Sequence, residues 1–141
     1  MFRKILAPVD LVDPPPALPA LAQAVELAEA SGGLVRLINI QSLMPATFMD
    51  YVPDNFDAEL EQRAKAALET IAAGLALPPA RRSTVVRAGG IYHEILAEAE
   101  EWGADLIVVG SHRPVMSDYL LGSNAKTIVR HANCSVLVVR P

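Results

Sequence analysis

The sequence predicts a single α/β domain built around a parallel β-sheet, and three observations support this fold class. Short aliphatic runs alternate along the chain with longer segments that place apolar residues at helical spacing, a pattern typical of strand–helix–strand units. Hydrophobic residues make up 52% of the sequence and aromatic residues 5%, as expected where aliphatic strands are buried on both faces. A length of 141 residues suits one domain with a substantial core. We therefore expect a three-layer, doubly wound sheet with right-handed crossovers.

The first elements are a strand, a helix and a second strand. Residues 2–9 predict a strand, in which Pro8 lies near the end, where a missing ladder donor is tolerated. A proline-rich connection leads to a helix that begins within 16–19, because proline is accepted in a first helical turn. This helix ends before the Gly32-Gly33 pair, since glycine suits a left-handed cap. The aliphatic run 34–40 predicts the second strand.

An irregular loop and a regular helix follow in the middle of the chain. Residues 41–56 predict a loop because they hold two prolines and show no clean periodicity. A loop of this length is either functional or mobile. It carries apolar side chains that are unusual for an exposed segment: Met44, Phe48, Met49 and Tyr51. Residues 57–75 predict a helix with Asp57 as a plausible N-cap.

The remaining segments repeat the alternation of strand and helix. We expect strands over 83–88, 105–109 and 135–139, and helices over 91–102 and from about 120 to 131. Gly110 ends the strand over 105–109, and Gly122, Ser123 and Asn124 lie next to the last helix. Free backbone N–H groups and the positive end of a helix dipole converge there, so the segment predicts an anion site. A plain N-cap is the alternative interpretation of Gly-Ser-Asn.

The C-terminal stretch resembles the signature of the universal stress protein family, G-x2-G-x9-G-[ST]. In this chain the signature stands as Gly110-x2-Arg113-x8-Gly122-Ser123, with arginine at the second glycine and a loop that is one residue shorter. The similarity extends to a first strand ending Ala7-Pro8-Val9-Asp10 and to residues 131–139, and covers essentially all 141 residues. The segment S-H-R-P followed by Y-L-L-G-S-N-A is similar to a variant in family members that look like ATP binders.

This resemblance implies both a fold and a function. The fold is Rossmann-like (adenine nucleotide alpha hydrolase-like) over residues 1–141, with strand order 3-2-1-4-5 and two helices on each face. The function is that of an ATP-binding stress-response protein, homodimeric through the C-terminal strand, in which the nucleotide acts mainly as a regulatory ligand. AMP and ADP are alternative ligands, and Mg²⁺ would bridge the phosphates. The competing hypothesis is a nucleotide-free dimeric adaptor that contacts an unknown protein through the 41–56 loop.

The expected binding site lies beyond the carboxyl ends of the strands, where strand order reverses in an open α/β sheet. The first strand delivers Pro8, Val9 and Asp10 to this edge. The resemblance assigns Asp10 to the ribose hydroxyls, whereas the residues alone equally allow it to cap the first helix. The resemblance also implies adenine contacts for four aliphatic residues that could equally be ordinary core: Val9, Ile40, Val109 and Val136.

Phosphate contacts are implied for the loop and the start of the last helix. Gly110 and Gly122 allow a close backbone approach, and Ser123 supplies a hydroxyl and an N–H. Arg113 replaces a backbone ligand with a bidentate, permanently charged guanidinium, which we favour over a loss of binding. His112 is implied as a further phosphate contact, with a solvent-facing loop residue as the alternative interpretation.

Charge, cysteine content and side-chain spacing argue against other classes of function. A net charge of −4 argues against a nucleic-acid partner. No apolar run reaches the roughly 20 residues of a membrane helix. The single cysteine, Cys134, suits a reducing compartment, so the expected location is cytoplasmic. Neither a metal site nor a catalytic residue is predicted, because no ligand cluster and no positioned general base is apparent, and the chain is at most a slow ATPase.

Overall fold

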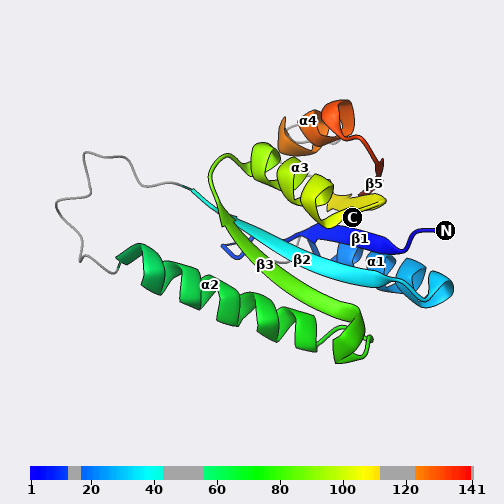
Figure 1. Ribbon diagram of the computed structural model, residues 1–141, viewed down its shortest axis with the longest axis horizontal. Helices are drawn as coiled ribbons and strands as arrows, with labels where there is room; N and C mark the ends of the chain where they lie inside the picture. The colour runs from blue at the N-terminus through cyan, green and yellow to red at the C-terminus, as the bar shows by residue number, and fades with distance from the viewer. Residues whose placement is uncertain (13–16, 43–55, 112–122, 141) are drawn as a thin grey trace.

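A computed structural model of the chain describes residues 1–12, 17–42, 56–111 and 123–140 and contains one five-stranded sheet (Figure 1). The strands are β1 Lys4–Pro8, β2 Leu34–Gln41, β3 Arg82–Ala88, β4 Leu106–Gly110 and β5 Ser135–Val139. All neighbours pair in parallel in the order β3-β2-β1-β4-β5. The structure therefore confirms the predicted doubly wound α/β fold and its strand order.

Two helices cover each face of the sheet (Figure 1). These helices are α1 Leu18–Ser31, α2 Phe56–Ala73, α3 Ile91–Trp102 and α4 Ser123–His131, with a short 3₁₀ turn η3 at Pro79–Arg81. Helices α1 and α2 share one buried apolar cluster with the sheet, and α3 and α4 share the other. Within the described residues, no helix is long and apolar enough to cross a membrane.

The central strand β1 shows why both faces need an apolar cover. Ile5 and Ala7 are fully buried in the α1 and α2 cluster, whereas Leu6 between them is fully buried in the α3 and α4 cluster. Side chains alternate across a strand, so a continuous aliphatic run feeds two cores at once. At the C-terminal end of α1, Gly32 adopts φ 71°, which is the left-handed cap expected from the sequence.

Several boundaries differ from the sequence-based predictions. Helix α2 begins at Phe56, so Asp57 lies within its first turn and not at the N-cap. Helix α1, by contrast, begins at Leu18 within the predicted range 16–19, with Ala17 at its N-cap and no side-chain hydrogen bond there. Strand β3 begins one residue before the predicted start and pairs with β2 along its whole length. The predicted partner-binding loop falls mostly outside the described residues, which end at 42 and resume at 56.

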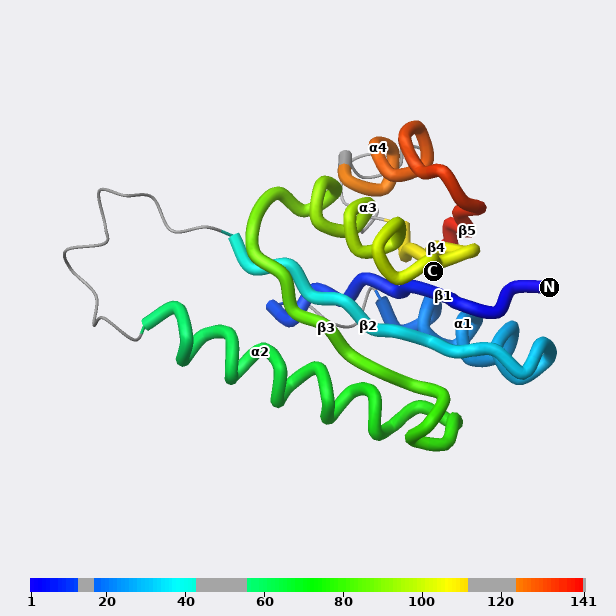
Figure 2. Tube along the Cα trace, viewed as in Figure 1, coloured from blue at the N-terminus to red at the C-terminus, as the bar shows by residue number. Residues whose placement is uncertain are grey.

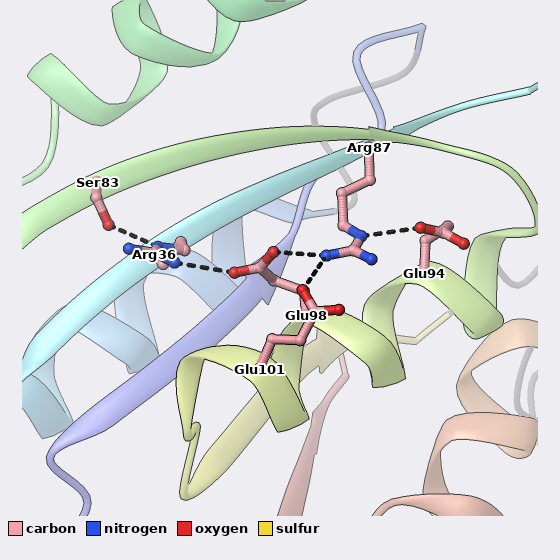
Figure 3. A network of polar contacts seen from close by, with 6 residues as sticks. All are labelled: Arg36, Ser83, Arg87, Glu94, Glu98 and Glu101. Carbon is pink, nitrogen blue, oxygen red and sulfur yellow. Dashed lines mark hydrogen bonds and ion pairs between the residues drawn. The ribbon is translucent and has the colours of Figure 1, made fainter.

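An ion network joins β2 and β3 to α3 (Figure 3). The Glu98 carboxylate accepts hydrogen bonds from Arg36 Nη1 at 2.9 Å and from Arg87 Nη1 at 3.0 Å. Arg87 also contacts Glu94 and Glu101, each at 2.8 Å. Charged contacts therefore replace apolar packing on this part of the sheet, a feature that the sequence analysis did not predict.

Candidate functional site

A cavity of about 800 Å³ opens at the carboxyl edge of the sheet. Strands β1, β2 and β3 run towards the same side, and α3 starts there (Figure 2). The strand order reverses around β1, which places the cavity where a ligand is expected in this class of fold. Seven predicted site residues are among its lining: Pro8, Val9, Asp10, Ile40, Val109, Gly110 and Asn124.

The other predicted site residues have different positions. Val136 lies on β5, packed against the apolar cluster of α3 and α4, and is not among the described residues that line the cavity. Ser123 is the first residue of α4. His112, Arg113 and Gly122 lie outside the described residues, so their phosphate contacts stay predictions.

Asp10 is exposed at the mouth of the cavity and organises its own turn. One carboxylate oxygen, Oδ1, accepts a hydrogen bond from the Val12 N–H at 2.9 Å. Because α1 begins after Ala17 without a side-chain cap, Asp10 is not the cap of that helix. It is also the only carboxylate among the described lining residues, which leaves it as the negative pole of the cavity.

The cavity wall contains apolar residues that the sequence analysis did not assign to a site. Ile91 and Ile95 come from the first turns of α3, and Ala125 and Ile128 come from α4. Their helical spacing and their position just after a strand were the available signals. With Val9, Ile40 and Val109, they make the wall mostly apolar, as is typical of small-molecule sites.

Asn39 is a polar lining residue that the sequence analysis did not assign to the site. It lines the cavity, is only 5% exposed, and interrupts the aliphatic run of β2. Its Nδ2 donates to the Val9 carbonyl at 2.9 Å, and its Oδ1 accepts from Gln41 Nε2 at 2.9 Å. A polar residue within a buried strand was a signal in the sequence, because such a group requires partners.

The backbone of Ile40 faces the space left where β1 ends. The Val9 N–H donates to the Ile38 carbonyl at 2.8 Å, whereas the Gly89 N–H donates to the Gln41 carbonyl at 2.9 Å. Peptide groups alternate between the two neighbours of a strand, so the N–H and C=O of Ile40 point to the same side as those of Ile38. They form a donor–acceptor pair at the cavity, beyond the last backbone bond between β1 and β2.

The described residues do not provide a metal site of their own. No group of three or more His, Cys, Asp or Glu side chains in this part of the chain could hold a metal ion.

Comparisons with known proteins agree with this architecture along the whole chain. A family model described as the universal stress protein family matches residues 1–140. Universal stress protein G of Shigella flexneri is 34% identical over 142 residues, covering 99% of this chain and 100% of that protein. The structure of universal stress protein UspA from Lactobacillus plantarum superposes with a TM-score of 0.78 at 26% identity, covering 99% of this chain and 98% of that one. An Arabidopsis thaliana family protein crystallised with AMP bound shares the fold, with a TM-score of 0.64 at 17% identity and coverage of 98% and 91%.

Proposed function

The chain belongs to the universal stress protein family, and we propose that it is an ATP-binding stress-response protein whose nucleotide acts mainly as a regulatory ligand. The observation that carries this proposal is the pairing of an apolar cavity with the Ile40 donor–acceptor pair at its edge. Adenine is flat and apolar on its faces, and its edge presents a donor, the 6-amino group, next to a ring-nitrogen acceptor. A volume of about 800 Å³ lies within the range of small-molecule sites.

The polar ends of the cavity suit the rest of a nucleotide. The Asp10 carboxylate can accept hydrogen bonds from ribose hydroxyls, which are stronger than neutral ones because the acceptor is charged. Asn124 lies in the first turn of α4, where unpaired backbone N–H groups favour a phosphate. Mg²⁺ would accompany the phosphates, and His112, Arg113 and Gly122 would complete their binding.

The assembly proposed for this protein is a homodimer in the cytoplasm. Strand β5 lies at the edge of the sheet and pairs with β4 on its inner side. Its Val136 and Val138 are half-buried. A sheet edge with aliphatic side chains favours pairing with a second strand, and light scattering of the purified protein would report the resulting mass.

Calorimetric titration with ATP and Mg²⁺ tests the nucleotide proposal. We expect saturable binding that weakens about tenfold in Asp10→Asn, since a hydrogen bond to a charged group contributes roughly 1.5–3 kcal/mol. Asp57→Asn is the matched control, because it makes the same charge change at an exposed position on α2. Titrations with AMP and ADP rank the three ligands, AMP being included because the Arabidopsis thaliana protein holds it.

The ribose assignment has its own readout. Asp10→Asn should weaken ATP more than it weakens 2′-deoxy-ATP, because the deoxy nucleotide lacks one of the hydroxyls that the carboxylate would accept. No binding of ATP at millimolar concentration would refute the nucleotide proposal, and an equal loss for both nucleotides would refute the ribose contact.

A further inference from the structure

The side chain of Asn39 stands in for a backbone donor at the end of β1. In a parallel ladder, a residue that donates to one residue of its neighbour accepts from the residue two positions further on. Val9 donates to the Ile38 carbonyl, so the ladder would next use the Ile40 N–H as donor to the Val9 carbonyl. Instead, Asn39 Nδ2 donates to that carbonyl at 2.9 Å. No backbone bond joins Ile40 to Val9 among the described residues.

Gln41 fixes the orientation of this amide. A carbonyl only accepts, so the atom of Asn39 that faces Val9 must be the NH₂ group. Gln41 Nε2 then donates to Asn39 Oδ1 at 2.9 Å, which satisfies the other end of the side chain. The backbone of Gln41 is itself held by the Gly89 N–H at 2.9 Å. These three contacts form a relay that runs from Gly89, the residue after β3, to the carbonyl of Val9, the residue after β1.

Because the relay is buried, few other groups can replace its hydrogen-bond partners. Asn39 is 5% exposed and Val9 is 3% exposed, so water is a poor substitute for either partner. If the amide were removed, the Val9 carbonyl would lose its donor, and a buried unpaired carbonyl is costly. The register of the ladder offers the Ile40 N–H as the replacement donor, and its bond to Val9 would extend the ladder into the cavity.

We propose that Asn39 is a positioning residue for base recognition, because it occupies the Val9 carbonyl and thereby reserves the Ile40 N–H and C=O for the edge of the bound base. This inference rests on the proposed adenine nucleotide site and deepens it by naming the residue that keeps the site open. Adenine presents an amino donor where guanine presents the O6 acceptor, so a reserved C=O at Ile40 favours adenine and disfavours guanine.

Hydrogen exchange of the Ile40 amide tests the inference without any ligand. In the unliganded protein, we expect this amide to exchange readily, and in Asn39→Leu to become protected because the Val9 carbonyl captures it. Asn133→Leu is the matched control, since Asn133 is exposed and lies in the bend before β5, and it should leave Ile40 unchanged. Because this readout needs no nucleotide, it stands even if wild-type protein fails to bind ATP, an outcome that would count against the proposed function alone.

The second readout is the discrimination between bases. Asn39→Leu should weaken ATP about tenfold while GTP binding changes little, so that the ATP-to-GTP affinity ratio falls by the same factor. If Asn39→Leu fails to fold, Gln41→Leu carries the test, because it keeps the donor but frees the amide to rotate, and it should move both readouts in the same direction to a smaller extent. Unchanged Ile40 exchange together with an equal loss of ATP and GTP affinity would overturn the proposal and leave Asn39 with a purely structural role.

Discussion

Removing the Glu98 carboxylate should destabilise the protein far more than removing its neighbour Glu101. Both side chains accept a hydrogen bond from Arg87 Nη1, Glu98 at 3.0 Å and Glu101 at 2.8 Å. They differ in exposure, because the Glu98 side chain is 7% exposed and the Glu101 side chain 67%. The pair Glu98→Ala and Glu101→Ala therefore compares a buried carboxylate that bridges Arg36 and Arg87 with an exposed carboxylate on the same Arg87 nitrogen.

The expected magnitudes follow from what each substitution leaves behind. Breaking a buried ion pair costs about 3–5 kcal/mol, because the remaining charge is desolvated and unpaired. In Glu98→Ala the loss should be smaller, about 2–3 kcal/mol, since the side chains of Arg36 and Arg87 are 25% and 22% exposed. Arg36 also keeps the Trp102 ring at 4.4 Å. Glu101→Ala should cost about 0.5 kcal/mol, as is usual for exposed pairs.

Urea denaturation followed by circular dichroism measures this difference. With a slope of about 1.5 kcal/mol/M, the midpoint should fall by about 1.5 M in Glu98→Ala and by about 0.3 M in Glu101→Ala. Glu98→Gln keeps the shape of the side chain and one acceptor oxygen, so its midpoint should lie between the two. Equal midpoints for Glu98→Ala and Glu101→Ala would show that burial of the network does not determine its contribution, and the reasoning would fail.

Two further predictions concern the close approach at β1 and the single cysteine. Gly33→Ala should destabilise the protein by about 2–3 kcal/mol, because a Cβ there would lie 2.9 Å from backbone atoms of Arg3 and overpacking a rigid site has that cost. Gly32→Ala should cost only about 1 kcal/mol, because Gly32 has φ 71° but open space around it. Urea denaturation of both variants measures the two costs, and the reverse order would contradict this reasoning. Burial, with a smaller effect of Asp105, raises the pKa of the Cys134 thiol above its ordinary value. The folded state therefore holds this proton more tightly, so the contribution to stability is complete below the pKa of the unfolded thiol and is lost as pH rises through the folded pKa. Cys134→Ala should lose less stability than wild type as the pH rises through the range in which the thiol ionises. Native Cys134 should react with iodoacetamide more slowly than Cys134 in urea, and equal rates would refute the pKa argument.

The sequence was sufficient for the order of strands and helices because each element has its own periodicity. The aliphatic run of β1 indicates burial on both faces, and the glycine pair after α1 indicates where that helix stops. Strand order came from the family resemblance, since alternation alone leaves several arrangements open. Cap preference locates a helix end only to within a residue or two, so Asp57 as the N-cap placed the start of α2 too late.

The ion network could not be read from one element at a time. Glu94, Glu98 and Glu101 lie on one face of α3, which by itself indicates a solvated stripe. Arg36 and Arg87 lie on different strands, 51 positions apart, and are brought to the same face only once β2 and β3 pair. A charged stripe on a helix becomes structural when the sheet beneath it supplies matching charges, and that requires the topology.

Two buried polar side chains, Glu98 on α3 and Asn39 on β2, have complementary effects on the elements around the cavity. Glu98 ties the middle of α3 to β2 and β3, whereas Ile91 and Ile95 of the same helix line the cavity. The charged contacts of α3 extend from Glu94 in its first turn to Glu101, and they hold the helix to β3 while Ile91 and Ile95 present apolar side chains to the cavity. Asn39 has the complementary effect from the sheet, because it ends the β1–β2 ladder where further pairing would close that space. An aliphatic side chain at position 39 would suit the core equally well by hydrophobicity, so the polar residue there is best explained by the gap that it preserves.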